Sequence, residues 1–531
     1  MTTPVLSQGP FVMGIDLGTE SCRVAIFDLA GKPIHFAATT YQTTHPRPGW
    51  AEQSPEDWWE ALQASTHKVL QGSGIPAHEI AGISYDATTT TVVAMDARGV
   101  ELRPAVMWMD VRAVEQAKRA SQSTSSARRY NGNGTAPASP EWYPFKAAWL
   151  RENERETYDK AAHLVDAPEW VNFKLTGEWT LNINSAAHRM YYDRDQGGWP
   201  VDFYEEIGVG DVFDKIPERV LDLGTPVGGL TTMAATALGL LPGTLVAQGS
   251  ADAWAGQVGL NVLTPGRMAL ITGSSHVLTG QTDKAISGEG FFGAYTDGVI
   301  PGQYTVEGGQ VSTGSVLKWF KDNFARDVVA AAERTGLNAY DVLNAQSRDL
   351  PPGAEGLIIN EYFQGNRTPY TDGQARGIIW GLSLHHGPEH FYRAIQESVC
   401  YGTEHILRTM RTAGLEVDQI VACGGATNSR DWMQMHSDVT GVPFTLTEVG
   451  DAVVLGSCIL AAAGAGLFDS VQAAADAMVH TAEVIEPDAE RHEEYKFYVD
   501  KYIDTYPRLR EPIHEMTAHI SARGSGKGGT E

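Results

Sequence analysis

Two segments in different halves of the chain share one pattern, in which a short turn of small polar residues joins two apolar runs. The first is GIDLGTESCRVAIFD (Gly14–Asp28), and the second is LITGSSHVL, whose turn holds residues 272–275. A hairpin turn needs only a glycine or an asparagine, so the extra carboxylate and hydroxyl groups call for another explanation. Two such turns facing each other across a cleft would hold a polyphosphate, because backbone amides and hydroxyls together bind anions. Each turn alone is also consistent with an ordinary hairpin that has a polar tip.

The segments that follow the first turn alternate between strand and helix patterns. SPEDWWEALQASTHKVL reads as a helix, with Ser54 as the N-cap and Pro55 at the first helical position. KPIHFAATTYQT extends the opening strands, and IAGISYD and TTVVAMD read as further strands. This alternation predicts an α/β layer structure.

Composition excludes several classes of function. The net charge of −25 argues against a nucleic-acid or anionic-membrane surface. The chain has no apolar run of the roughly 20 residues that a membrane span needs, and its start shows no secretion signal. Four scattered cysteines without a CxxC pair argue against a disulfide frame or a zinc site. A soluble cytoplasmic protein is therefore expected.

The 531 residues are enough for two large domains. The polar segment Ser121–Pro140 is expected to form an exposed loop rather than a linker, because globular patterning resumes directly after it. The domain boundary is placed near NVLTPGRMALITGSSH. The resulting prediction is a first domain over residues 1–264, a second over 265–520, and a disordered tail over 521–531.

Two further segments carry chemistry. In GSADAWAGQVG, Asp252 follows an apolar run and stands among small residues. A carboxylate placed there could accept the proton of a sugar hydroxyl as that oxygen attacks phosphorus, although helix capping is the common use of such an aspartate. In VACGGATNSRDWMQMHSDVTGVPF, a strand ends in two glycines and a helix opens near Ser429. A nucleotide ring could lie on this backbone, which is not the dinucleotide-binding fingerprint.

These segments, taken together with TGSSH and GNRTPYTDGQARG, resemble the FGGY carbohydrate kinase family. Their order and approximate spacing match over essentially the whole chain apart from both tails. The resemblance implies an α/β fold of the actin-like ATPase (ribonuclease H-like) class, with two related domains and ATP in the cleft between them. It also implies Asp252 as the catalytic base, and Mg²⁺ held by Asp16 and Asp252, partly through water.

The same resemblance assigns the residues expected to bind ATP. They come from the two polar turns, from EGGQVSTGSVLKW and from the glycine pair near residue 424. In chain order they are Asp16, Gly18, Thr19, Thr272, Gly273, Ser274, Ser275, Gly314, Lys318, Gly424, Gly425, Ala426 and Ser429.

GTES, VEGGQ and WMDVRA resemble the ribulokinase branch of the family. An open-chain ketopentose, with ribulose as the first candidate, is therefore the expected substrate. Its apolar face could stack on Trp108, and its hydroxyls could bond to Glu307 and Asp252. The resemblance adds Asp86 and Thr88 to the sugar-binding residues, and Arg189 as a further one that could equally be structural.

Two kinds of alternative remain open. The acceptor could be xylulose, another ketose or a polyol such as a tetritol, because epimers differ by only one hydroxyl position. An ATPase or sensor of the actin-like fold that phosphorylates no sugar is the alternative from another class. The expected partners are a small-molecule sugar and ATP, without nucleic acid or membrane, and a homodimer is one assembly considered.

Overall fold

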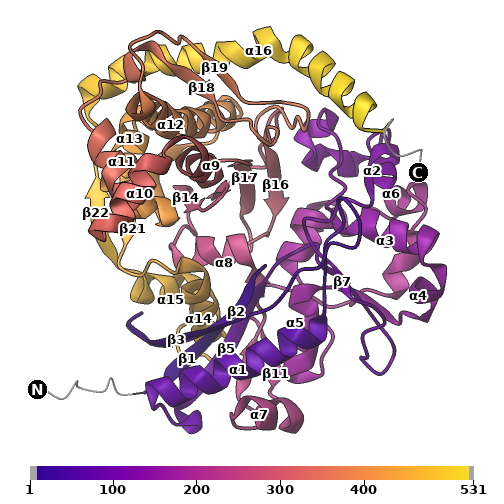
Figure 1. Ribbon diagram of the computed structural model, residues 1–531. Coiled ribbons are helices and arrows are strands. Elements are labelled where there is room, and N and C mark those ends of the chain that lie inside the picture. The colour runs from indigo at the N-terminus through magenta and orange to yellow at the C-terminus, as the bar shows by residue number, and fades with distance from the viewer. Residues whose placement is uncertain (1–8, 526–531) are drawn as a thin grey trace, which may run out of the picture.

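The computed structural model describes residues 9–525, with side chains to residue 520, and contains two large mixed β-sheets (Figure 1). The first has seven strands, with β13 (Ser250–Ala251) paired to β5 beside the main path. In spatial order that path is β11 (Pro226–Gly229), β12 (Leu245–Ala247), β5 (Ile80–Ala87), β1 (Phe11–Leu17), β2 (Ser21–Asp28) and β3 (Pro33–Thr40).

The second sheet also has seven strands. They are, in spatial order, β16 (Phe292–Thr296), β17 (Tyr304–Gln310), β15 (His276–Thr282), β14 (Gly266–Thr272), β20 (Val417–Gly424), β21 (Phe444–Thr447) and β22 (Thr481–Ile485).

The two sheets repeat one topology. In the first, β1 and β2 form an antiparallel hairpin, β3 pairs with β2, and β5 runs parallel to β1 on the other side. In the second, β14 and β15 form the hairpin, β17 pairs with β15, and β20 runs parallel to β14. The repeated hairpin seen in the sequence is thus the start of two related α/β domains, as predicted.

Helices cover both faces of the sheets. Those before residue 260 are α1 (Pro55–Ser73), α2 (Val114–Ala120), α3 (Tyr143–Asn153), α4 (Arg155–Lys160), α5 (Ala167–Thr176), α6 (Val201–Glu206), α7 (Thr232–Leu238) and α8 (Asp252–Gly259). Those after it are α9 (Gly314–Phe324), α10 (Arg326–Thr335), α11 (Ala339–Ser347), α12 (Pro388–Thr412), α13 (Arg430–Thr440), α14 (Ala452–Gly464), α15 (Val471–Met478) and α16 (Ala489–Ser525).

Smaller sheets complete the fold. A four-stranded sheet holds β4 (Glu52–Gln53), β7 (Ala105–Val106), β6 (Val92–Met95) and β8 (His163–Asp166). Two strand pairs join β9 (Leu181–Asn182) to β10 (Val220–Leu221) and β18 (Ile358–Asn360) to β19 (Ile378–Trp380). The strand predicted from TTVVAMD is therefore present as β6, but in this smaller sheet rather than beside β5.

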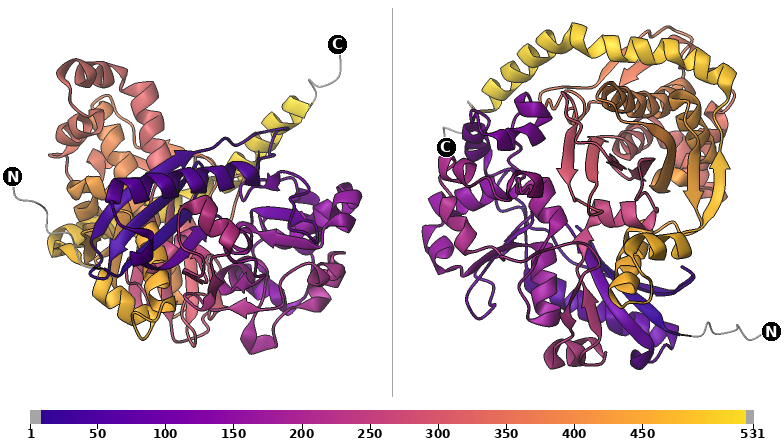
Figure 2. Two further views of the ribbon diagram at one scale, coloured as in Figure 1. Left: turned by 90° about the horizontal axis from the view of Figure 1, so that it is seen from below. Right: turned by 180° about the vertical axis from the view of Figure 1, so that it is seen from behind.

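The two lobes meet at a pair of crossing helices, α8 and α14 (Figures 1 and 2). In sequence, α14 lies between β21 and β22 of the second sheet, but it packs on β1 and β5 of the first, while α8 packs against β14 and β15 of the second. A Cβ added at Gly456 would lie 1.9 Å from the Ala255 carbonyl oxygen, and one added at Gly259 would lie 1.8 Å from that of Ala452. Backbone therefore touches backbone at this crossing, and only glycine allows that approach.

Gly456→Ala is expected to lower the free energy of unfolding by about 3 kcal/mol, because the added methyl must push α8 and α14 apart. A helix otherwise favours alanine over glycine by roughly 1 kcal/mol, so the expected sign opposes helix propensity. Urea unfolding followed by circular dichroism measures the change. Gly373→Ala is the matched control, since an added Cβ there meets no atom within 4 Å, and equal stability of the two variants would contradict the prediction.

Two expectations about local structure need correction. The segment Ser121–Pro140 is not a fully exposed loop, because its short helical turns bury Arg128, Tyr130 and Asn131. Tyr130 is held there by a 2.6 Å hydrogen bond that its hydroxyl donates to Asp193. The prediction that Ser54 is the N-cap of α1 is confirmed by its position, although its side chain makes no capping bond among the described residues.

α16 packs along α12, α13 and β18 over the outside of the second domain (Figure 1). It extends to Ser525, so residues 521–525 are helical where a disordered tail is predicted. Residues 526–531 of that predicted tail lie outside the described residues. None of the helices within residues 9–525 has both the length and the apolar character that crossing a bilayer requires.

Candidate functional site

Strand register brings three carboxylates to one edge of the first sheet. Asp16 of β1 is the register partner of Asp86 on the parallel strand β5, and Asp86 is in turn the partner of Ser250 on β13. Asp252 follows Ser250 by two residues and is the first residue of α8. Because parallel strands end at a common edge, residues far apart in sequence converge here.

Arg23 links this cluster of three carboxylates to the second half of the chain. Its guanidinium pairs with Asp16 and lies 2.9 Å from Asp451 Oδ2, just before α14. Ser457 of α14 donates a 2.7 Å hydrogen bond to Asp86 Oδ2. Asp16 and Asp86 are thus held by contacts that reach across from α14 and the residue before it.

The cluster of three carboxylates suits the binding of a divalent cation. Asp86 Oδ1 is buried and has no hydrogen-bond partner within the described residues. Burial raises the pKa of Asp86 well above its ordinary value, and the negative charge of Asp16 raises it further. Burial likewise raises the pKa of Asp16, although Arg23 opposes that shift. Clustered carboxylates with an unpartnered oxygen and mutual repulsion suit Mg²⁺, which binds oxygen ligands.

Burial raises the pKa of Asp252 to about 6, and the negative charge of Asp16 adds to that effect. The backbone amide of Ala253 opposes the shift by donating a 2.6 Å hydrogen bond to Asp252 Oδ1. A carboxylate with this pKa is largely deprotonated at neutral pH and can still accept a proton, which suits a general base.

We expect kcat/KM to fall as the pH drops through about 6, because protonated Asp252 cannot accept a proton. An aspartate with an ordinary pKa near 3.9 would keep the rate flat to well below pH 5. Product formation measured from pH 4.5 to 8 at saturating MgATP gives the profile. The acidic limb should be missing from the residual activity of Asp252→Asn, and a wild-type rate that is flat down to pH 5 would contradict the assignment.

A cavity of about 480 Å³ opens beside Asp252, between the two domains. It draws together residues that the sequence analysis assigned separately to phosphate, metal and sugar. Those that line it are Asp16, Gly18, Thr19, Thr88, Trp108, Arg189, Asp252, Ser275 and Glu307.

One part of this cavity is built for a polar organic ligand. Arg189 and Glu307 form a two-bond ion pair at 2.9 and 2.7 Å, and both side chains are largely buried. The Arg189 guanidinium also lies over the rings of Trp142 and Trp254, at 5.4 and 5.2 Å from their centroids. Arg189 is therefore not a free surface residue, and it links the first domain to Glu307 of the second.

Trp108 and Thr88 line the same cavity on the first domain. The Trp108 indole Nε1 donates to Thr19 Oγ1 at 3.0 Å, so the sugar-side tryptophan contacts the first polar turn directly. Thr88 Oγ1 lies 2.9 Å from the hydroxyl of Thr91. These bonds fix both side chains before any ligand binds.

The residues of the second polar turn differ in role: one lines the cavity, and others make hydrogen bonds within the protein. Ser275 lines the cavity, and the Ser274 carbonyl accepts hydrogen bonds from the backbone amides of Thr313 and Ser315. Thr272, however, turns its hydroxyl away to donate 2.7 Å to the Cys423 carbonyl and to accept from Ala426 N–H. The Thr272 hydroxyl therefore braces β20, and the phosphate contact of Thr272 stays a prediction.

The glycine-rich segments close against this second turn. Gly314 begins α9 so near the Gly273 carbonyl oxygen that an added Cβ would lie 2.4 Å from it. Gly424 has φ of +92°, and its Cβ position would lie 2.0 Å from the Thr272 carbonyl oxygen. Gly425 meets nothing within 4 Å of its Cβ position, which leaves its backbone open to a flat ligand.

Two of the predicted nucleotide-side residues make other contacts. The Ser429 hydroxyl accepts from the Trp432 amide and so caps α13. Lys318 lies on the exposed face of α9, where its ammonium pairs with Asp322. A contact between Lys318 and ATP would require this ion pair to open.

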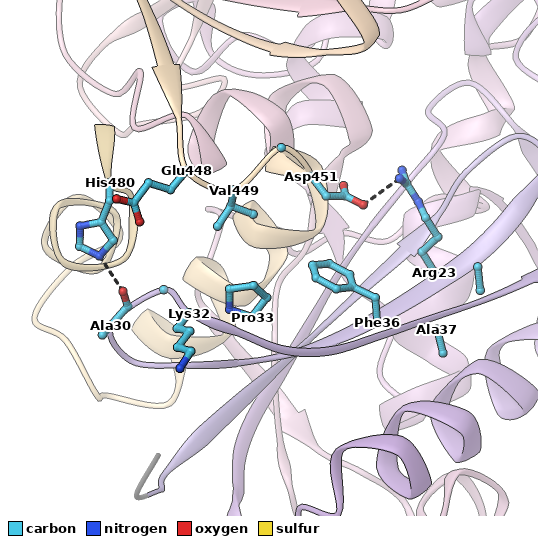
Figure 3. Close-up of a pocket in the computed structure, with 13 residues that line it drawn as sticks. Arg23, Ala30, Lys32, Pro33, Phe36, Ala37, Glu448, Val449, Asp451 and His480 are labelled. Atoms are coloured by element: carbon cyan, nitrogen blue, oxygen red, sulfur yellow. Dashed lines mark hydrogen bonds and ion pairs between the residues drawn. The ribbon is translucent and has the colours of Figure 1, made fainter. Parts of the chain in front are cut away.

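A larger hollow of about 820 Å³ lies beside the edge strand β3, opposite the loop before α14 (Figure 3). Phe36 and Lys32 line one side, and Glu448, Asp451 and His480 line the other. The predicted site residues all lie within the described part of the chain, and none of them lines this hollow. The smaller cavity at Asp252 is therefore the candidate site, because the predicted chemistry gathers there.

Sequence reasoning missed three residues that shape the candidate site: Arg23, Trp142 and Trp254. Arg23 could have been found, since Asp16 and Arg23 are directly opposite each other in the first hairpin. The two tryptophans carried no usable signal, because their approach to Arg189 depends on how distant segments pack.

The architecture of two related α/β domains meeting at a cleft is that of the actin-like ATPase fold. Residues 11–259 match the N-terminal domain, and residues 268–465 the C-terminal domain, of the FGGY family of carbohydrate kinases. The chain belongs to the FGGY family of carbohydrate kinases, whose members use ATP.

Curated relatives agree over nearly the full length. The chain is 32% identical to an FGGY carbohydrate kinase domain-containing protein of Xenopus laevis, covering 93% of this chain and 95% of that protein. It is 30% identical to a ribulokinase of Anoxybacillus flavithermus, covering 86% of each. The crystal structure of a xylulose kinase from Rhodospirillum rubrum superposes with a TM-score of 0.84 at 26% identity, covering 95% of this chain and 100% of that one. The protein is therefore a sugar kinase.

Proposed function

We propose that this protein transfers the γ-phosphoryl group of ATP to the terminal hydroxyl of an open-chain ketopentose, with ribulose as the first candidate. One observation supports it above the others. Asp252, whose pKa lies near 6, shares a single interdomain cavity with a phosphate-type turn and with the Arg189–Glu307 pair. A base, a phosphate cradle and a polyol-binding pair are the parts that such a transfer needs.

Asp252 acts as the general base. It takes the proton of the attacking hydroxyl as the bond to phosphorus forms. Its place at the first turn of α8 holds the carboxylate rigidly, because Ala253 N–H binds one of its oxygens. The partly buried setting leaves the carboxylate basic enough to do this near neutral pH.

The triphosphate lies between the two polar turns, on Gly18 and Thr19 of the first domain and on the Gly273–Ser275 backbone of the second. Amides in such turns bind anionic oxygens and stabilise the charge that develops during transfer. The adenosine lies against Gly424–Ala426 and the start of α13. Mg²⁺, held by Asp16 and Asp252 partly through water, supplies neutralisation of phosphate charge when bound.

The sugar lies along Trp108, with Asp252 at its terminal hydroxyl. Thr88 offers an acceptor on the first domain, whereas the predicted sugar contact of Asp86 stays a prediction because Asp86 does not line the cavity. Arg189 donates and Glu307 accepts at the other part of the cavity, which suits a carbonyl and its neighbouring hydroxyls. A site that bonds each hydroxyl rejects analogues lacking one, so this arrangement favours a chain with several hydroxyls over a smaller polyol.

Xylulose is the second candidate, because the well-superposed structure from Rhodospirillum rubrum is named a xylulose kinase. The two sugars differ in configuration at one carbon. Ribulose remains the first candidate because the GTES, VEGGQ and WMDVRA segments resemble the ribulokinase branch.

A panel of phosphoryl acceptors tests the proposal. Both enantiomers of ribulose and xylulose, erythrulose, erythritol and glycerol are compared by ADP release and by mass spectrometry of the phosphorylated product. We expect the highest kcat/KM for one ribulose enantiomer. A higher value for xylulose would make xylulose the substrate, and ATP hydrolysis unaffected by every acceptor would overturn the proposed transfer to a ketopentose.

A further inference from the structure

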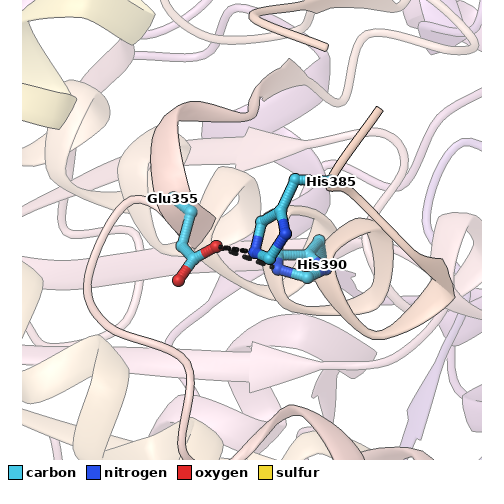
Figure 4. Close-up of side chains that lie close together, drawn as sticks. All are labelled: Glu355, His385 and His390. Atoms are coloured by element: carbon cyan, nitrogen blue, oxygen red, sulfur yellow. Dashed lines mark hydrogen bonds and ion pairs between the residues drawn. The ribbon is translucent and has the colours of Figure 1, made fainter. Parts of the chain in front are cut away.

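A group of histidine and glutamate side chains lies on the second domain, outside the cavities described above. Glu355 belongs to a short 3-10 turn over Ala354–Gly356, while His385 and His390 lie in the loop and first turn at the start of α12 (Figure 4). The two segments are separate in sequence. In the fold they come together, and each of the three side chains offers one atom that could bind a metal ion.

The three ligand atoms converge. Glu355 Oε2 lies 2.6 Å from His385 Nε2 and 3.3 Å from His390 Nε2. All three atoms lie within 4.8 Å of one another. Glu355 and His385 are exposed while His390 is buried, so a cation from solution can reach the group and find one ligand already fixed.

The backbone holds Glu355 in an unusual conformation. Ala354 and Glu355 have φ of 44° and 55°, in the left-handed region that residues with a Cβ rarely adopt. His386 Nε2 lies 3.3 Å from the Glu355 carbonyl oxygen and holds the turn from outside. Strain of this kind, about 1–3 kcal/mol per residue, persists where the surrounding structure over-determines it.

His390 also has the outer partner typical of a metal-binding histidine. Its Nδ1 lies 3.1 Å from Glu389 Oε1, on the ring side opposite the nitrogen that faces Glu355. A ligating histidine commonly donates its second ring N–H to a carboxylate, which orients the ring and raises its basicity. The Gly387 amide lies 3.0 Å from the same Nδ1, so metal binding would exchange this contact for donation to Glu389.

We propose that Glu355, His385 and His390 bind a borderline divalent cation of the Zn²⁺ class. Two imidazole nitrogens and one carboxylate oxygen suit Zn²⁺, whereas Mg²⁺ takes oxygen ligands. The exposed side leaves a fourth position for water. The bound cation ties the 354–356 turn to the start of α12, away from the reaction site.

Calorimetric titration of the chelator-treated full-length protein with ZnCl₂ tests this site. We expect one zinc ion per chain, and a binding constant at least about tenfold weaker in His385→Ala and in Glu355→Gln. His385 has a side chain 71% exposed, so its replacement leaves the core intact. His78→Ala, the loss of an exposed histidine elsewhere, is the matched control and should bind zinc as the wild type does.

Thermal unfolding supplies a second measurement, since a ligand that binds only the folded state raises the melting temperature. Zinc should raise it for the wild type and His78→Ala but not for His385→Ala, and an equal concentration of Mg²⁺ should not substitute. Equal zinc binding by wild type and His385→Ala would overturn the proposal. So would zinc binding that is lost in Asp252→Asn but kept in His385→Ala, because that result places the ion in the interdomain cavity.

Discussion

Replacing Asp252 with asparagine is expected to lower kcat by about three orders of magnitude, in the range that general-base catalysis supplies. Such a factor corresponds to about 4 kcal/mol of lost transition-state stabilisation. The amide keeps the shape of the side chain and can still accept from Ala253 N–H, but it cannot take the proton of the attacking hydroxyl. In the proposed arrangement the adenosine and most of the triphosphate contact other segments, so the KM for ATP should stay within about threefold of the wild-type value.

Steady-state rates at saturating sugar and MgATP measure this effect. Asp438→Asn is the matched control, since Asp438 is a buried aspartate of α13 that does not line the cavity, and it should retain nearly full kcat. Raising Mg²⁺ should not restore the Asp252→Asn rate if proton transfer is what is lost. Turnover above a tenth of the wild-type value would remove Asp252 from the role of base.

Local patterns were strong enough to predict the elements that begin each domain. Alternation of apolar residues around a polar turn predicted the β1–β2 and β14–β15 hairpins, and α1 was placed by its proline at the first position and its acidic first turn. These signals are local, because each depends on neighbours within one or two turns of the chain.

Long-range packing could not be predicted in the same way. α14 crosses to the first sheet because Gly456 and Gly259 let two helix backbones touch, and neither glycine marks its partner in the sequence. The burial of Tyr130 in the polar 121–140 segment depends on Asp193, which lies far along the chain. Composition alone therefore described that segment as more exposed than it is.

In the candidate site, too, local features could be predicted from the sequence and long-range contacts could not. Asp16 and Asp86 lie at the ends of β1 and β5, and Asp252 directly follows β13, so their convergence at a sheet edge could be anticipated from strand ends. The hydrogen bond of the Thr272 hydroxyl to the Cys423 carbonyl could not be anticipated, because Cys423 lies on a strand more than a hundred residues away. The sequence of a turn shows that its hydroxyl groups can form hydrogen bonds, but the tertiary structure determines their partners.

Glu307→Gln is expected to raise the KM for the ketopentose by about a hundredfold, which corresponds to about 3 kcal/mol. The amide offers a weaker acceptor to the sugar hydroxyls and leaves the Arg189 guanidinium without its paired charge. The KM for ATP should change little, because Glu307 lies on β17 in the part of the cavity proposed for the sugar. A contact present in both the bound state and the transition state changes KM more than kcat.

A second ion pair serves as a control that separates the effect of Glu307→Gln on stability from its effect on sugar binding. Glu404 and Glu307 are each 4% exposed, and Glu404 pairs with Arg408 and Arg411 on α12, outside the cavity. Glu404→Gln should therefore destabilise the fold to a similar extent, as measured by urea unfolding, and leave the sugar KM unchanged. If both variants lose stability equally and neither changes the sugar KM, the Arg189–Glu307 pair is a brace between the domains rather than a sugar contact. A selective rise in KM for Glu307→Gln alone assigns the Arg189–Glu307 pair to recognition, since Glu307 lines the cavity beside Asp252 and Glu404 does not.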